Sequence, residues 1–233
     1  MINIKIGFKI VGIRNFGGVF LYIYEVIEQK EGLPIRAIIH SVDSFKMHWH
    51  NTIEILLVLK GSVNVRIGEE VYCLEENEFI LINSNELHST KKTKDNNMLL
   101  AIQIDLKFFQ KYYPQINKIK IDCKSFHGGE GEQEKFDNIR YYIAKIVWEL
   151  NKKNKGYNLK IGGYLYLLGF YLVNNFEYTI LDDEKEKLRD KDIYRLQRIM
   201  DYVMNNIDKK ITLKEVAENE HLNVRPLHFS GHV

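Results

Sequence analysis

The spacing of apolar residues changes once along this chain of 233 residues, between positions 122 and 132. Before the change, apolar residues alternate at period two in short segments, as strands require. The clearest of these segments are 55–60, 63–67, 71–74, 79–82 and 98–104. Short strands at intervals of about 8–12 residues predict a closed barrel or a sandwich. The segment 55–60 is apolar at both alternating sets of positions, so we expect it to be covered on both faces.

After residue 132 the apolar residues recur at steps of three and four, which is typical of amphipathic helices. One helix is predicted over 132–153 and ends at Asn154-Lys155-Gly156. A second, over 158–175, is apolar nearly all round, which indicates burial against several elements or against a partner chain. A third carries an apolar face from Ile193 to Ile207.

The charges nearly cancel, with 33 basic and 31 acidic residues, so no strong global field for nucleic acid or membrane follows. Any partner must therefore be argued from local sites. Cys73 and Cys123 form no CxxC pair, which predicts idle thiols in a reducing compartment. There is no signal-peptide pattern, and no uncharged apolar run reaches the roughly 18 residues that a spanning helix needs. We therefore expect a cytoplasmic protein that does not enter the membrane.

Three histidines and a glutamate in the strand-rich half could form a pocket. His48 and His50 are two residues apart, and Glu54 follows at a further even offset, so one regular strand would direct all three to one face. His88 follows a turn and could reach the same place from a neighbouring strand. Neutral imidazole and carboxylate suit a divalent first-row metal. The same side chains could instead line a small-molecule pocket, or make structural hydrogen bonds without a metal, and the sequence leaves these alternatives open.

The segment 48–54, followed by Gly61, resembles the first motif of the cupin family. The segment 74–88 resembles the second motif in part, since Asn83-Ser84-Asn85 replaces its Pro-x-Gly turn. The resemblance implies a cupin-like β-barrel, a double-stranded β-helix. In metal-dependent cupins the residues matching His48, His50, Glu54 and His88 hold iron, manganese or a similar ion, which supports oxygenase, isomerase or hydrolase chemistry.

The C-terminal part has the rhythm of a helix-turn-helix in 211–217 and 221–224. Thr212 is a good N-cap, and Glu215 three residues later completes a capping box that opens a short helix over 213–220. The small Ala217 permits close helix packing, and Asn223 could cap one further helix.

Taken together, these parts resemble the AraC/XylS family of bacterial transcription regulators. The resemblance implies a small-molecule effector in the barrel, such as a sugar, a homodimer formed through the helices, and sequence-specific DNA binding. It makes Thr212, Asn223, Arg225 and His228 the candidate DNA contacts. The family's second helix-turn-helix is absent, so we expect a truncated regulator whose DNA binding is impaired.

The predicted fold class is therefore α+β, with a cupin-like barrel, a helical dimerisation segment and a partial helix-turn-helix. The predicted domains are a cupin-like effector-binding domain over 1–125, the dimerisation segment over 126–182, and a linker with the truncated DNA-binding domain over 183–233. A regulator that is not an enzyme is the leading interpretation. The alternatives are a metal-dependent cupin enzyme using the four pocket residues, and an interaction module that dimerises with a full-length relative.

Overall fold

The protein is described here by a computed structural model covering residues 9–13, 22–27, 32–94, 96–127, 129, 131–181, 198–199, 202, 206, 209 and 211–220. The chain divides into two compact units, Met1–Ile180 and Leu181–Val233. The first contains all the described strands and the two long helices, and the described residues of the second include one short helix and the helical residues 198, 199 and 202.

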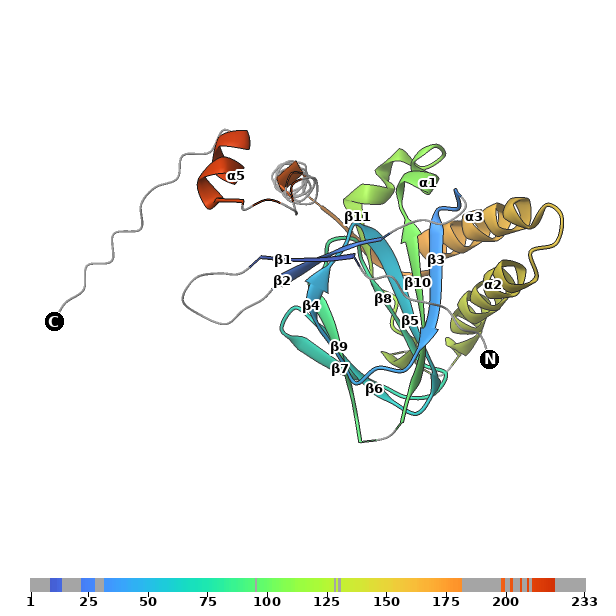
Figure 1. Cartoon of the computed structure of the whole chain (residues 1–233). Helices are drawn as coiled ribbons and strands as arrows, with labels where there is room; N and C mark the ends of the chain where they lie inside the picture. The colour runs from blue at the N-terminus through green and yellow to red at the C-terminus, as the bar shows by residue number, and fades with distance from the viewer. Residues whose placement is uncertain are drawn as a thin grey trace. The chain divides into compact units, whose positions relative to one another are not determined.

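Two facing sheets form the barrel that the period-two spacing predicts (Figure 1). The larger sheet has the order β1 (Lys9–Ile13), β2 (Tyr22–Val26), β4 (Ser44–Trp49), β9 (His88–Lys92), β6 (Val63–Ile67) and β7 (Glu70–Leu74). The smaller sheet has the order β3 (Ile35–His40), β10 (Met98–Asp105), β5 (Thr52–Lys60) and β8 (Phe79–Ile82). All neighbouring strands pair antiparallel except β2 and β4, which are parallel. The five predicted strand segments are confirmed as β5, β6, β7, β8 and β10.

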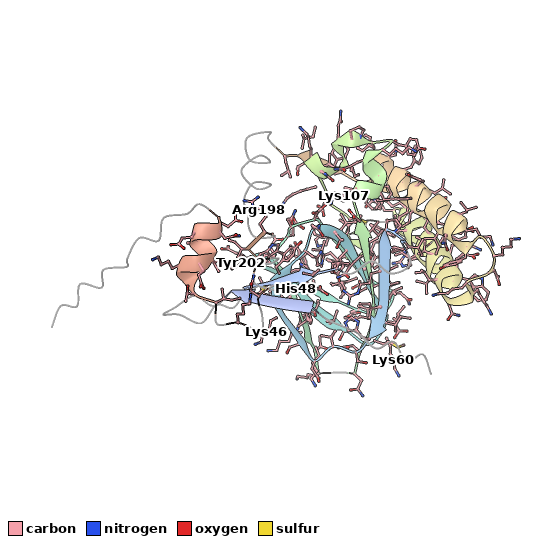
Figure 2. All side chains as sticks on the ribbon, turned by 45° about the horizontal axis from the view of Figure 1, so that its top comes forward. Lys46, His48, Lys60, Lys107, Arg198 and Tyr202 are labelled. Carbon is pink, nitrogen blue, oxygen red and sulfur yellow. The ribbon has the colours of Figure 1, made fainter. Side chains whose placement is uncertain are left out.

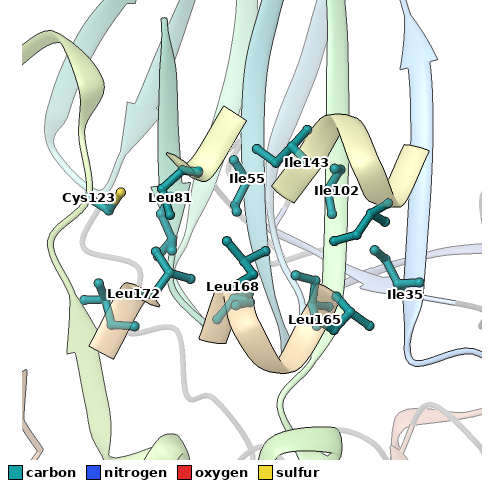
Figure 3. Close-up of a cluster of buried hydrophobic side chains, with 14 of the residues drawn as sticks. Ile35, Ile55, Leu81, Ile102, Cys123, Ile143, Leu165, Leu168 and Leu172 are labelled. Atoms are coloured by element: carbon teal, nitrogen blue, oxygen red, sulfur yellow. The ribbon is translucent and has the colours of Figure 1, made fainter. Parts of the chain in front are cut away.

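Alternation along β5 sends its side chains into two separate cores, as its apolar sequence predicts. Ile53, Ile55 and Leu57 belong to the core between the smaller sheet and the helices. Leu56 and Val58 point the other way, into the apolar core between the two sheets. Figure 3 shows the outer core, where Ile55 and Ile102 of the sheet meet Leu165 and Leu168 of a helix.

Two long helices cover the outer face of the smaller sheet, α2 (Gln133–Lys152) and α3 (Tyr157–Asn175), close to the predicted bounds (Figure 1). The helix α2 ends at Lys153, which adopts the left-handed conformation, and Gly156 precedes α3 in the same conformation. The connection between β10 and α2 contains α1 (Lys107–Gln110), η1 (Pro114–Lys118), β11 (Ile119–Ile121) and η2 (Ser125–His127). Among the described residues, no helix is both long and apolar enough to cross a bilayer.

Gly61 turns the chain between β5 and β6, at the position where the first cupin motif has its glycine. Its φ of 71° is in the left-handed region. A Cβ atom there would also lie 2.2 Å from the carbonyl oxygen of Asn96. Both the backbone conformation and the close approach of the neighbouring loop therefore require glycine.

The second unit contains α5 (Leu213–Asn219), which begins with the predicted capping box. The Thr212 hydroxyl accepts a hydrogen bond from the Glu215 amide, and the Glu215 carboxylate accepts one from the Thr212 amide. Arg198 donates two hydrogen bonds to the buried carboxylate of Glu220, just after α5. Of the predicted helix over 193–207, the structure describes residues 198, 199, 202 and 206. The first three of these are helical.

Candidate functional site

The structure brings the four predicted pocket residues together at one end of the barrel interior, and all four are buried. The even offsets predicted one regular strand for His48, His50 and Glu54, and that prediction is wrong, whereas His88 does come from a neighbouring strand. His48 lies on β4, His50 lies in the turn that follows, and Glu54 lies on β5 of the opposite sheet. His88 starts β9 and pairs directly with His48 across the larger sheet. The tight turn at 50–51 thus carries the chain from one sheet to the other, and convergence results from closure of the barrel. Figure 2 labels His48.

Each imidazole is held through its Nδ1 atom by a backbone carbonyl two residues away. Nδ1 lies 2.9 Å from the Lys46 carbonyl in His48, 3.1 Å from the Thr52 carbonyl in His50, and 2.8 Å from the Glu86 carbonyl in His88. A carbonyl oxygen can only accept, so each Nδ1 carries the proton. The three Nε2 atoms are therefore the ones presented to the interior.

Glu54 is the acceptor on which these groups converge. Its Oε2 lies 2.6 Å from Nε2 of His50 and 3.1 Å from the side-chain amide of Gln103. Nε2 of His88 lies 3.5 Å away and has no hydrogen-bond partner among the described residues. A buried imidazole nitrogen without a partner is costly to the fold unless something else binds it.

His48 and His50 have pKa values shifted in opposite directions within the pocket. Burial, reinforced by His88, lowers the pKa of His48 to about 3, so His48 is neutral at physiological pH. Burial acts in the same direction on His50, but the hydrogen bond and charge of Glu54 outweigh it and raise the pKa of His50. Burial would raise the pKa of Glu54, yet its contacts with His50 and His88 hold it well below the ordinary value. Without a cation, His50 and Glu54 therefore form a buried ion pair.

The four side chains fit a divalent cation. Their ligand atoms all lie within 4.8 Å of one another, and two donors about 2.1 Å from one ion can be at most roughly 4.2 Å apart, so small side-chain shifts would bring all four onto an ion. The inward Nε2 atoms and the unpartnered nitrogen of His88 are what such an ion requires. His48, His50, Glu54 and His88 would hold it, and the ion would supply a Lewis-acidic centre to a bound ligand. The ion would have to displace the proton that His50 shares with Glu54.

A second polar group lies next to these residues and was not predicted. Glu25 on β2 accepts a hydrogen bond from Arg36 at 2.9 Å, and Gln103 lies between the carboxylates of Glu25 and Glu54. Oε2 of Glu25 is 3.6 Å from Nε2 of His48. One signal was available, because Gln103 is the only polar residue inside the apolar run 98–104. Nothing local marks Glu25 or Arg36.

The predicted DNA contacts are described only at Thr212. Its hydroxyl takes part in the capping box, which confirms its predicted role as an N-cap. Asn223, Arg225 and His228 lie outside the described residues.

The barrel and its site define a cupin-like domain in an α+β protein. Residues 36–123 match the AraC-like ligand binding domain. The chain is also 24% identical over 183 residues to the uncharacterized HTH-type transcriptional regulator YdeC of Bacillus subtilis (strain 168). That match covers 74% of this chain and 60% of the relative. The chain is therefore similar to AraC-type regulators in its ligand-binding segment, and it spans 60% of the length of this curated relative.

Two solved structures are similar in part. One is the oxalate decarboxylase of Bacillus subtilis, 18% identical over 32% of this chain and 22% of the other, with a TM-score of 0.30. The other is a cupin-2 domain containing protein from Shewanella frigidimarina, 19% identical over 34% of this chain and 74% of the other, with a TM-score of 0.29. With TM-scores this low, neither structure bears on function.

Proposed function

We propose that this protein is a cytoplasmic transcription regulator that senses a small molecule at the polar end of its barrel and binds specific DNA through its C-terminal unit. The observation that carries this proposal is the position of the four converging residues inside the segment that matches the AraC-like ligand binding domain. The ligand class is a small polar molecule such as a sugar, because the site offers charged and hydrogen-bonding groups in a buried setting.

A thermal-shift screen with sugars and other small polar metabolites tests effector sensing. A ligand that binds only the folded state raises the melting temperature as its concentration rises. We expect stabilisation by at least one compound without its consumption, and a smaller shift in Gln103→Leu, which removes an amide from the polar end. A screen in which no compound stabilises the chain contradicts effector sensing.

We further propose that the protein forms a homodimer through α2 and α3, within the predicted dimerisation segment 126–182. Large apolar side chains on these helices are exposed, and exposed apolar surface favours a protein partner. They are Tyr141, Trp148, Leu159, Leu167 and Phe170. Along α3, Lys160 is the one charged residue, so this helix has little charge to oppose a second copy. On α2, by contrast, Lys145 and Lys152 lie over the rings of Tyr141 and Trp148.

Sedimentation velocity tests the dimer. Leu167→Glu combined with Phe170→Glu should convert the dimer to a monomer, because two charges would be desolvated at the contact. The matched control is Val71→Glu, which places the same charge on an apolar residue, 52% exposed, of β7 in the other sheet. A wild-type chain that sediments as a monomer at micromolar concentration contradicts the proposal.

DNA binding is proposed for the second unit, with Thr212, Asn223, Arg225 and His228 as contacts. It is supported by the capped helix α5, the buried Ala217 and the HTH-type relative. A gel-shift assay with the upstream region of its own gene, at two salt concentrations, tests it. Specific binding should weaken in Arg225→Ala, and absence of sequence preference contradicts it.

A metal-dependent cupin enzyme is the second candidate function, and the inward Nε2 atoms with the unpartnered nitrogen of His88 favour it. It predicts close to one equivalent of metal in protein purified without chelator, and turnover of the ligand found in the screen. Metal analysis with product analysis separates the two functions. A ligand that stabilises the protein and is recovered unchanged supports the regulator.

A further inference from the structure

The strand β2 supplies a charged residue to the barrel interior although it lies before the matched domain segment. Glu25 is 2% exposed. Its Oε1 accepts from Arg36 at 2.9 Å, and its Oε2 faces Nε2 of His48 at 3.6 Å and the amide of Gln103 at 3.4 Å. Glu25 therefore contacts the cation-binding group directly at His48 and indirectly, through Gln103, at Glu54.

The attachment of β2 to the barrel is short. It pairs with β4 in parallel through two register positions, Ile23 with His48 and Tyr24 with Trp49. The Tyr24 and Trp49 rings also meet edge to face, with centroids 5.8 Å apart. On its other side β2 pairs with β1 over five positions (Figure 1). The β1–β2 pair is thus joined to β4 beside His48, one of the four pocket residues.

The charges near Glu25 favour a cation. Glu25 and Glu54 bring two buried carboxylates, whereas Arg36 brings one positive charge. Once a cation has displaced the proton that His50 shares with Glu54, the two carboxylates and Arg36 carry one excess negative charge in a buried environment. A divalent cation at the four pocket residues would offset that excess, and its attraction to the Glu25 carboxylate would be little screened there.

We propose that Glu25 is a positioning residue of the cation site, and that cation binding consequently stabilises the attachment of the β1–β2 pair to the barrel. Glu25 accepts a hydrogen bond from Gln103, which also donates to Glu54, so Glu25 positions Glu54 in the way that outer hydrogen-bond partners orient metal ligands. Its carboxylate also lies 3.6 Å from Nε2 of His48, the nitrogen that would bind the ion, and would attract the cation there. Coupling between two events is reciprocal, so a docked β2 strengthens cation binding by the same factor that the cation strengthens docking. This inference rests on the cation site and requires neither an effector nor DNA.

The test uses the full chain, stripped with a chelator and titrated with Mn²⁺. Free Mn²⁺ is followed by electron paramagnetic resonance, and hydrogen exchange is measured on peptides spanning 22–27, β4 and β9. In the wild type, Mn²⁺ should slow exchange in all three. Glu25→Gln should bind Mn²⁺ about 10- to 100-fold more weakly. At saturating Mn²⁺, the Glu25→Gln variant should still show slower hydrogen exchange in β4 and β9. Its peptide 22–27 should exchange as fast as it does without Mn²⁺.

The matched control is Glu69→Gln, the same change at an exposed glutamate after β6, which should behave as wild type. The new amide oxygen at position 25 can still accept from Arg36, so folding should be retained. If Glu25→Gln fails to fold, Gln103→Leu tests the same coupling and should lower Mn²⁺ affinity. Unchanged Mn²⁺ affinity in the variant, or unchanged exchange of 22–27 in the wild type, overturns the proposal. Absence of Mn²⁺ binding by the wild type also overturns it, whereas effector sensing is judged separately by the thermal-shift screen.

Discussion

The two ends of the barrel interior are built from the same strands and have opposite chemistry. On β5 the inward face carries Glu54 at one end and Val58 at the other, and on β10 it carries Gln103 and Leu99. The apolar end buries Val58 and Leu99 completely. Strand alternation places all four residues on the inner face, so position along the strand, and not the choice of face, separates the ends.

Stability and binding reside at opposite ends of the barrel. Apolar burial at one end stabilises the fold by roughly 1.5–3 kcal/mol per large side chain. The polar end contains a histidine whose lowered pKa opposes folding as the pH falls below 6.5, and another with an unpartnered buried nitrogen, which opposes folding at any pH. A polar end of this kind is best explained by binding, since polar groups buried at a cost are typical of functional sites.

The largest effect on stability should follow truncation at the apolar end. Leu99→Ala should lower the free energy of unfolding by about 2–5 kcal/mol, because it leaves a cavity among completely buried neighbours. Mn²⁺ affinity should stay close to that of the wild type. Urea denaturation in chelator measures the first quantity and a Mn²⁺ titration the second. A loss of stability below about 1 kcal/mol would remove the distinction between the two ends.

A conservative change at the polar end should affect Mn²⁺ binding more than it affects the free energy of unfolding. Glu54→Gln weakens the charge-assisted contact with His50 and should cost about 1.5–3 kcal/mol, less than the apolar truncation. Mn²⁺ binding should be lost, because a carboxylate ligand is replaced by an amide. The same two measurements apply, with Glu69→Gln as the control at an exposed position. Retained Mn²⁺ binding would show that Glu54 is not a ligand.

A smaller effect should appear as pH falls. In the unfolded chain His48 takes up a proton near its ordinary pKa of 6.5, whereas in the folded chain it does so only near pH 3. Stability in chelator should therefore fall between these values, by at most about 1.4 kcal/mol per pH unit from this group. His50 adds little to that slope, since its raised pKa leaves it protonated in both states below 6.5.

Urea denaturation between pH 6.5 and about 5, in the wild type and in His48→Gln, measures this fall in the free energy of unfolding. The difference between the two slopes isolates His48 from other groups that titrate in the same range. Equal slopes would mean that His48 is not buried in its neutral form.

Much of the fold could be predicted because its signals are local. The strands β5 to β8 and β10, and the helices α2, α3 and α5, follow from apolar spacing and from the Thr212 capping box. The strands β1 to β4 were not predicted, although β4 alternates polar with apolar residues over Ser44–Trp49, as a strand with one face toward a polar environment does. The four pocket residues could be predicted as a group, although the reason given for Glu54 was wrong, since a turn and a change of sheet separate it from His50.

The strands β5 to β8 and β10, the long helices and the four converging residues follow from local sequence, because periodicity, capping and motif spacing act over a few neighbouring residues. The tertiary structure sets which other side chains join those four. Glu25 and Gln103 meet across 78 positions of the chain, and Arg36 joins them from a third strand. It also decided protonation, since burial and contacts from both sheets separate the pKa of His48 from that of His50. Such properties depend on which distant strands are brought together when the barrel closes, and no local pattern records that.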